Sequence, residues 1–179
     1  DLLGTDQDLI VDRFILSQAV MLSLAGIPGI YFHSLVGSGN DISGMEESGI
    51  PRRINRLKYD LDELSHVLAD KGSLQFEIFN RFRSLVCIRT QQRAFHPNGD
   101  QVVLDIDNRQ VLGFSRTNPD KTESIIVLYN FSCKKQTIRI KNNSKHSGTD
   151  LMTKEQVILS SPITLAPLMF QWVKLNVPA

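Results

Sequence analysis

Cysteine and tryptophan are scarce in this sequence. Two cysteines and one tryptophan occur among 179 residues, and no CxxC motif is present. Cys87 and Cys133 lie among apolar residues, so we expect two reduced thiols in the core or near the surface, and not a disulfide. This use of cysteine favours a cytoplasmic location.

An excess of one charge and a long apolar run are also missing. Lys and Arg number 20 and Asp and Glu number 19, which gives a net charge of +1 and argues against a strongly basic nucleic-acid binder. The longest apolar-rich stretch, residues 19–31, is interrupted by Ser23, Gly26 and Pro28 and is shorter than the roughly 18 apolar residues that a membrane span requires. We therefore expect neither a nucleic-acid nor a membrane partner.

Motifs for metals and nucleotide cofactors are absent as well. The four histidines show no HxxH or HExxH spacing, and there is no P-loop or GxSxG motif. Gly37 and Gly39 lack the third glycine of a dinucleotide-binding turn. Glu46 and Glu47 are adjacent in a predicted loop and point apart, so they do not form an acid–base pair. The sequence predicts no cofactor and no metal.

The residues before about position 94 have mainly helical patterns. Asp6 is a candidate N-cap for a helix with apolar residues at helical spacing from Leu9 to Ala25, and Gly26 followed by Pro28 would end it. An acidic helix is predicted from about residue 60 to 70, and a longer one, capped by Ser73, to about residue 92.

A short aromatic segment and a long polar segment separate these helices. Residues 29–33 follow a breaker and predict a buried strand, and residues 34–58 predict a long loop. A loop at the carboxyl end of a buried strand lies where α/β proteins bind ligands. Its candidate binding residues are Asn40 and Asp41, the arginines Arg52, Arg53 and Arg56, and His33. The alternatives are a solvated loop with ordinary surface arginines and a structural histidine at a strand end.

The residues after position 94 favour strands separated by turns. Apolar or β-branched segments at 102–106, 110–117, 125–131, 136–141, 156–159, 163–165 and 170–175 alternate with turn residues, and 142–148 is a polar loop. Short antiparallel strands at this spacing are typical of a β-sandwich.

Three segments together resemble enzymes of glycoside hydrolase family 13, the α-amylase superfamily. Residues 25–32, Ala-Gly-Ile-Pro-Gly-Ile-Tyr-Phe, resemble the last barrel strand of these enzymes. Residues 37–41, Gly-Ser-Gly-Asn-Asp, followed by Arg53-Ile54-Asn55-Arg56, are similar to the sucrose phosphorylase branch. Residues 150–172 resemble the closing strands of the C-terminal β domain.

The resemblance implies an α+β fragment: the final helix–strand–helix portion of a (β/α)8 TIM barrel in residues 1–93, including the loop 34–58, and an antiparallel β-sandwich in residues 94–179. It implies a retaining reaction in which an aspartate attacks the anomeric carbon, a glutamate protonates the leaving oxygen and a second aspartate stabilises the transition state. These carboxylates would precede Asp1, and we expect a preceding segment because the chain does not begin with Met.

The resemblance also assigns binding roles. Arg56 matches the arginine that holds the glucosyl unit, and Asn40 and Asp41 match the loop that shapes the acceptor and phosphate site. Arg53 replaces an acidic residue of sucrose phosphorylases, so glucosylglycerate or a phosphorylated sugar are alternatives to sucrose as the substrate.

The implied partners are a glucoside, inorganic phosphate and the remaining N-terminal barrel portion. We expect the isolated fragment to be inactive and to self-associate through residues 9–33, since an unpaired barrel strand exposes its edge. The alternative functions are a hydrolase or transglucosidase of the same family, and a non-catalytic carbohydrate-binding or structural β module. Trp172 argues against that module because its pattern indicates a core position.

Overall fold

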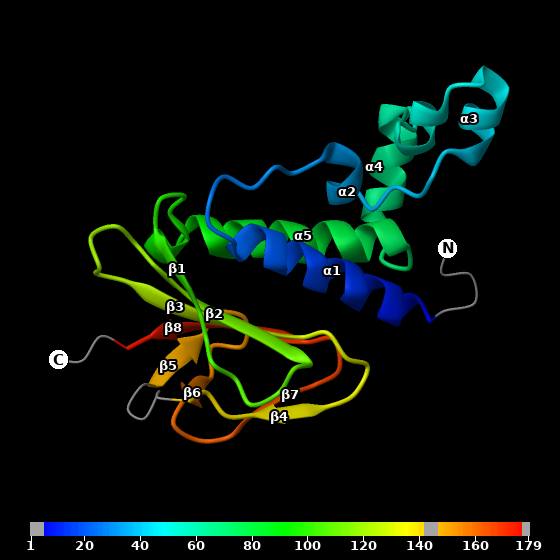
Figure 1. Ribbon diagram of the computed structural model, residues 1–179. Helices are drawn as coiled ribbons and strands as arrows, with labels where there is room; N and C mark the ends of the chain where they lie inside the picture. The colour runs from blue at the N-terminus through cyan, green and yellow to red at the C-terminus, as the bar shows by residue number, and fades with distance from the viewer. Residues whose placement is uncertain (1–5, 142–146, 177–179) are drawn as a thin grey trace. The chain divides into compact units, whose positions relative to one another are not determined.

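A computed structural model describes residues 6–141 and 147–176 and divides the chain into two compact units (Figure 1). Unit 1 comprises Asp1–Ile15 and Gly29–Ser84, and unit 2 comprises Leu16–Pro28 and Leu85–Ala179. The division falls within the helices α1 (Gln7–Ser23) and α5 (Leu74–Thr90), so each of them contributes to both units.

Unit 1 is helical in its described residues. Besides its parts of α1 and α5, it contains α2 (Phe32–Leu35), α3 (Ile42–Ser48), the 3-10 helix η1 (Pro51–Asn55) and α4 (Leu61–Ala69). Its part of α1 packs on its part of α5: the rings of Phe14 and Phe82 meet edge to face at 6.3 Å, and Arg81 pairs with Asp12 at 2.9 Å. Residue numbers rise together along both helices, so these two helical parts run in the same direction.

Local capping determines where the helices begin. The side chains of Asp6, Asp60 and Ser73 each accept a backbone N–H two or three residues further along, at 3.2, 2.9 and 3.0 Å. Such caps satisfy donors that have no partner within the helix. The predicted helices are therefore confirmed, although α1 ends at Ser23, two residues before the predicted end at Ala25.

The prediction of a buried strand at residues 29–33 is wrong for this structure. Residues 29–31 are irregular, residue 32 begins α2, and Tyr31 and Phe32 are 47% and 50% exposed. A strand requires a neighbouring strand for its backbone hydrogen bonds. None of the described strands pairs with this segment, whose Tyr31 and Phe32 carbonyls instead accept helical N–H groups from Leu35 and Val36.

The prediction of an irregular loop over residues 34–58 is also wrong in part, because the segment contains α3 and η1. Asp41 caps α3, and Gly49 ends it with a φ of 63°, in the left-handed region that glycine adopts without strain. Pro51 occupies the first turn of η1, where its missing N–H costs nothing. The polar composition of residues 34–58 predicted a loop and did not indicate these short helices.

Unit 2 contains two antiparallel sheets, and all its described strands follow residue 93. The larger sheet has the order β1-β2-β3-β8-β5-β6, and β4 pairs with β7. The strands are β1 (Asp100–Val103), β2 (Val111–Thr117), β3 (Ser124–Asn130), β4 (Gln136–Ile138), β5 (Ser147–Asp150), β6 (Gln156–Ile158), β7 (Ile163–Leu165) and β8 (Phe170–Leu175). The 3-10 helix η2 (Arg93–Phe95) precedes them.

Both faces of the larger sheet are covered within unit 2. Ile126, Leu128 and Val173 lie on one face and share a core with Ile138 and Ile163 of the smaller sheet, which lies beside it in Figure 1. The opposite face packs against the part of α1 that belongs to unit 2. Burial on both faces explains why β3 is a continuous apolar run and not an alternating one. The prediction of antiparallel strands in residues 94–179 is confirmed.

The start of strand β5 differs from the sequence prediction, whereas the burial of Trp172 agrees with it. Strand β5 begins at Ser147, inside the predicted loop 142–148; residues 142–146 of that loop lie outside the described residues. Ser147 and Gly148 are not strand-forming residues, so β5 depends on pairing with β6 and β8. Trp172 is fully buried, as predicted, and both cysteines are exposed and not joined in a disulfide.

Across the described part of the chain, no helix is long and apolar enough to cross a membrane.

Candidate functional site

Two neighbouring hollows in unit 1 form the candidate site, and both have the size of a small-molecule pocket. Each has a volume of about 550 Å³. The first is lined by Ile10, Phe14, Tyr31, His33, Ser34, Gly37, Ser38, Gly39, Asn40, Asn55, Leu74, Gln75 and Ile78. The second is lined by Tyr31, Pro51, Arg52, Ile54, Asn55 and Arg56.

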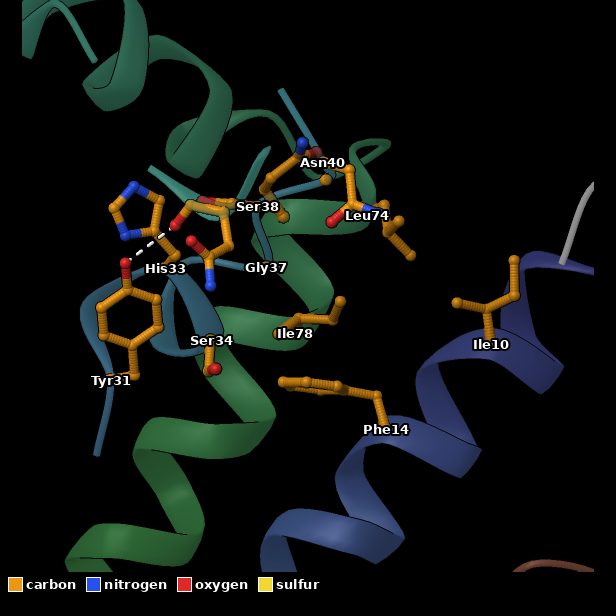
Figure 2. Close-up of a pocket in the computed structure, with 13 residues that line it drawn as sticks. Ile10, Phe14, Tyr31, His33, Ser34, Gly37, Ser38, Asn40, Leu74 and Ile78 are labelled. Atoms are coloured by element: carbon orange, nitrogen blue, oxygen red, sulfur yellow. Dashed lines mark hydrogen bonds between the residues drawn. The ribbon is translucent and has the colours of Figure 1, made fainter. Parts of the chain in front are cut away.

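The first hollow has an apolar side and a polar side. Figure 2 shows Ile10 and Phe14 of α1 and Ile78 of α5 on one side, with Ser38 and Asn40 on the other. Apolar walls with a few polar groups are typical of small-molecule sites.

Tyr31 and Asn55 connect the two hollows because they line both. The Tyr31 hydroxyl donates to the Asn55 carbonyl at 2.8 Å (Figure 2). Neither residue is among the site residues predicted from the sequence. Both lie in segments that resemble the family, Tyr31 in residues 25–32 and Asn55 between Arg53 and Arg56, and this position is the signal that could have singled them out.

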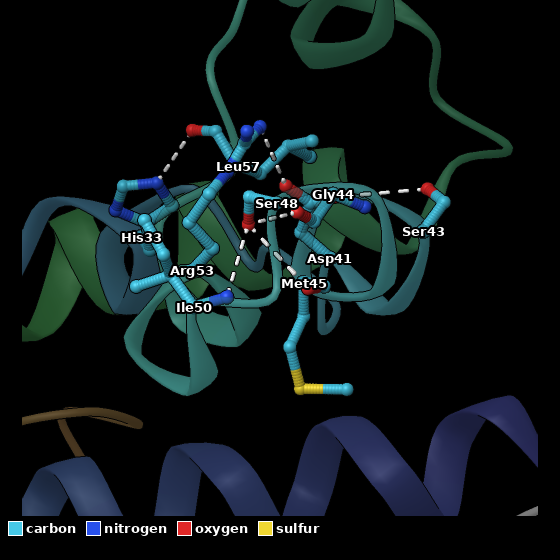
Figure 3. Close-up of polar contacts among 9 residues, drawn as sticks. All are labelled: His33, Asp41, Ser43, Gly44, Met45, Ser48, Ile50, Arg53 and Leu57. Carbon is cyan, nitrogen blue, oxygen red and sulfur yellow. Dashed lines mark hydrogen bonds and ion pairs between the residues drawn. The ribbon is translucent and has the colours of Figure 1, made fainter.

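The predicted site residues fall into two groups. His33 and Asn40 line the first hollow and Arg56 lines the second. Asp41 and Arg53 line neither hollow and instead face each other, with 3.8 Å between Arg53 Nη2 and Asp41 Oδ2 (Figure 3). The structure thus brings Asn40, His33 and Arg56 to the hollows and leaves Asp41 and Arg53 beside them.

Asp41 organises the polar segment. Its side chain is buried, and its Oδ1 accepts the Gly44 N–H at 2.9 Å, while its own N–H donates to the Ile54 carbonyl at 2.7 Å. A carboxylate at a helix N-terminus satisfies backbone donors and interacts favourably with the helix dipole. The position that the sequence suggested for ligand binding therefore joins α3 to η1 in this structure.

His33 is held by one ring nitrogen. Its Nε2 donates to the Leu57 carbonyl at 2.8 Å (Figure 3), and its Nδ1 is buried without a hydrogen-bond partner among the described residues. The ring stacks on Tyr31, with centroids 5.0 Å apart. These contacts favour the structural role that the sequence analysis kept as an alternative, at the border of the first hollow.

The charge of the site is positive near the second hollow. Arg52 and Arg56 are exposed there, and Arg53 is partly neutralised by Asp41. Guanidinium groups bind carboxylates and phosphates through forked pairs of hydrogen bonds. In the described residues, no group of three or more His, Cys, Asp or Glu side chains could hold a metal ion.

We expect Gly44→Ala to weaken the Asp41 cap. A Cβ at Gly44 would overlap the Asp41 carboxylate, whereas a Cβ at Gly39 would meet nothing within 4 Å. Displacing the cap should cost about 1 kcal/mol, the usual cost of losing an N-cap. Hydrogen exchange of the amides in residues 42–48 should accelerate in Gly44→Ala and stay unchanged in Gly39→Ala. Equal exchange in both variants would contradict the capping role.

Comparisons with known proteins identify the class to which this fold corresponds. No protein-family model matches the chain. Among solved structures, AmyP in complex with maltotriose aligns with a TM-score of 0.75 and 16% identity over 94% of this chain and 35% of that chain. An Anoxybacillus α-amylase aligns with a TM-score of 0.65 and 18% identity over 94% of this chain and 33% of that chain. The fold is that of a portion of an α-amylase-type enzyme.

The sequence relatives of the chain indicate a narrower group of enzymes than the similar structures do. The chain is 36% identical to the glucosylglycerate phosphorylase of Escherichia coli K12 over 90% of this chain and 28% of the relative. It is 47% identical to that of Allomeiothermus silvanus over 55% of this chain and 18% of the relative. The sucrose phosphorylase of Agrobacterium vitis is 28% identical over 71% of this chain and 24% of its own length.

The chain spans less than a third of the length of these relatives. It is homologous to the C-terminal region of phosphorylases of glycoside hydrolase family 13, in the branch that includes sucrose phosphorylase. The predicted resemblance is confirmed.

Proposed function

We propose that this chain is the C-terminal portion of a retaining glucosyl-transferring phosphorylase. In this proposal residues 1–93 are the last part of a (β/α)8 barrel and residues 94–179 are its C-terminal β domain. The parallel packing of α1 on α5 within unit 1 supports this arrangement, because successive helices of such a barrel run in the same direction. Alignment to about a third of each amylase-type structure supports it as well.

The proposed substrate is glucosylglycerate. The observation that carries this choice is that glucosylglycerate phosphorylases match at 36–47% identity and the sucrose phosphorylase at 28%. Phosphorolysis would break the bond between the anomeric carbon and the glycerate oxygen. The glucosyl group would pass to a phosphate oxygen, which forms α-glucose 1-phosphate, and the proton would go to glycerate. The catalytic Asp, Glu and Asp would be supplied by a preceding segment.

The candidate site supplies binding groups for this reaction. Arg56 at the second hollow would hold the glucosyl unit, and Asn40 at the first hollow would contact the acceptor or phosphate. Asp41 and His33 would act by holding these segments in place. The glycerate carboxylate is an anion, and Arg53 lies beside the site with its side chain 36% exposed. A guanidinium there suits a carboxylate better than the neutral fructosyl unit of sucrose.

We expect Arg53→Gln to impair the use of glucosylglycerate selectively. In the complete protein, kcat/KM for glucosylglycerate should fall about tenfold, the effect of about 1.4 kcal/mol in binding, while kcat/KM for any neutral glucoside used should change less than twofold. Arg83→Gln, at an exposed position of α5, should leave both unchanged. Equal losses for the charged and the neutral substrate would show that Arg53 does not recognise the carboxylate.

The complete protein tests the proposal directly. The gene is first read upstream of the codon for Asp1, where we expect barrel strands with an Asp after strand four, a Glu after strand five and a His-Asp pair after strand seven. The product is then assayed for glucose 1-phosphate released from glucosylglycerate or sucrose, with and without phosphate. A start codon directly before Asp1 would overturn the proposal, as would turnover that phosphate does not accelerate.

The second candidate is a hydrolase or transglucosidase of the same family, which the α-amylase-type fold favours. Release of free glucose at a rate independent of phosphate would support it. The carbohydrate-binding module is less well supported, because Trp172 is buried and unavailable for stacking on a sugar. Quenching of Trp172 fluorescence by oligosaccharides would support that module.

We also propose that the chain alone is inactive and associates through the segment around residues 9–33. Exposed apolar side chains support this surface: Leu24, Ile27, Ile30, Tyr31 and Phe32. In the complete enzyme, we propose that the remaining barrel portion covers them.

A further inference from the structure

We propose that Tyr59 is a positioning residue of the candidate site, because its hydroxyl fixes the segment that carries Asn40 to the segment that follows Arg56. This inference rests on the proposed phosphorylase function for its kinetic consequences. Its structural basis is independent of the reaction.

The segment Gly37–Asp41 is attached at both ends through its backbone. The Ser38 N–H donates to the His33 carbonyl at 2.8 Å, and the Asp41 N–H donates to the Ile54 carbonyl at 2.7 Å. Gly37 adopts a φ of 64° and lies so close to Ile78 that an added Cβ would be 3.0 Å from its Cδ1. These contacts hold the backbone at Gly37, Ser38 and Asp41, and the Ser38 side chain provides a further point of attachment next to Gly39 and Asn40.

Tyr59 supplies that side chain. Its hydroxyl donates to Ser38 Oγ at 2.6 Å, across 21 residues of sequence. Its ring meets the rings of Phe32 and His33, with centroids 6.4 and 6.0 Å apart. The ring is therefore fixed by aromatic neighbours, and the hydroxyl reaches Ser38 from a defined direction.

A second hydrogen bond attaches the backbone next to Arg56. Leu57 follows Arg56 directly, and the Leu57 carbonyl accepts the His33 Nε2–H at 2.8 Å. His33 thus holds residue 57 through its side chain and Ser38 through its carbonyl. Tyr59, two residues after Leu57, adds a further link because its hydroxyl donates to Ser38 Oγ. One network of hydrogen bonds consequently sets Asn40 at the first hollow relative to Arg56 at the second.

A pair of conservative substitutions isolates the hydrogen bond. Tyr59→Phe keeps the ring contacts and removes only the donor, and Ser38→Ala removes only the acceptor. In the complete protein, each variant should raise KM for the glucoside at least fivefold with kcat changed less than twofold, and the double variant should show no further rise. Ser65→Ala, at an exposed serine of α4, serves as the matched control.

Hydrogen exchange provides a readout that does not depend on turnover. The amides of Ser38 and Asp41 should exchange at least fivefold faster in Tyr59→Phe, in Ser38→Ala and in the double variant alike. Unchanged exchange, or effects that add in the double variant, would overturn the positioning role. Faster exchange in a complete protein whose wild type shows no phosphorolysis would instead overturn the proposed function and leave the positioning role supported. Faster exchange with unchanged KM would show that the segment does not determine substrate binding and would overturn the kinetic part of the inference.

Discussion

Arg116→Met is expected to lower the free energy of unfolding of unit 2 by about 3 kcal/mol, because it removes the donor of the buried Ser23 carbonyl and two further hydrogen bonds of the guanidinium. Arg116 of β2 is fully buried. Its guanidinium donates to the carbonyls of Ser23 at 2.6 Å, His96 at 2.7 Å and Asp100 at 3.2 Å. It therefore ties the end of α1, the segment after η2 and the edge strand β1 to the sheet.

The size of this effect follows from the balance between desolvation and hydrogen bonding. Burial, assisted by the positive charge of Arg89, lowers the pKa of Arg116, which shows that the charged form is held at a cost. Methionine removes that cost but also removes every donor. A buried acceptor left without a partner, here the Ser23 carbonyl, costs about 1–3 kcal/mol. The lost bonds to the partly buried carbonyls of His96 and Asp100 add to this cost, so the loss outweighs the gain.

Urea unfolding followed by the fluorescence of Trp172, the single tryptophan, measures this change. Arg116→Lys should be intermediate, because an ammonium keeps the charge but cannot match the fork of the guanidinium. Arg109→Met, at an exposed position of the same unit, should leave the midpoint unchanged. A midpoint for Arg116→Met within the error of the wild type would contradict the role of Arg116.

Tyr129→Phe is expected to cost about 2–3 kcal/mol, the penalty for leaving a buried donor unsatisfied. Tyr129 of β3 is fully buried. Its hydroxyl accepts the Trp172 Nε1–H at 2.8 Å, lies 2.6 Å from Ser23 Oγ and donates to the Ala19 carbonyl at 3.1 Å. Burial raises the pKa of Tyr129 above its usual range, so the hydroxyl remains protonated and can fill these roles.

The loss should come mainly from the indole N–H of Trp172. Ser23 keeps its hydrogen bond to the Val20 carbonyl, whereas the described structure gives the indole N–H no second acceptor. A double variant with Trp172→Phe should therefore lose less stability than the sum of the two single variants, measured by circular dichroism during urea unfolding.

Tyr31→Phe is the matched control, because the Tyr31 hydroxyl is exposed and its loss should cost well under 1 kcal/mol. Additive losses in the double variant, or a cost for Tyr129→Phe no greater than that of the control, would contradict this account.

The sequence predicted the elements whose signals are local. Asp6 and Ser73 cap the helices that they were predicted to cap, since a side chain and a backbone N–H two or three residues away need no other part of the chain. The apolar residues of β3 and β8 indicated strands and a core position for Trp172, because burial favours such runs wherever they pair.

The candidate site was predicted less completely. Asn40, His33 and Arg56 do line the hollows, but Tyr31 and Asn55, which connect them, were missed. Asp41, predicted as a ligand-binding carboxylate, caps α3 in this structure. A carboxylate has the same chemistry in both roles, so only the backbone around it decides which donors it meets.

The sequence by itself therefore determined the helices, most of the strands and the enzyme family to which this chain is homologous, because caps, periodicity and short motifs are properties of neighbouring residues. Only the tertiary structure decided that residues 29–33 form no strand, that β5 pairs between β6 and β8, and that Tyr59 reaches Ser38. Strand pairing and long-range hydrogen bonds depend on a partner distant in sequence, and no local pattern specifies which partner is present.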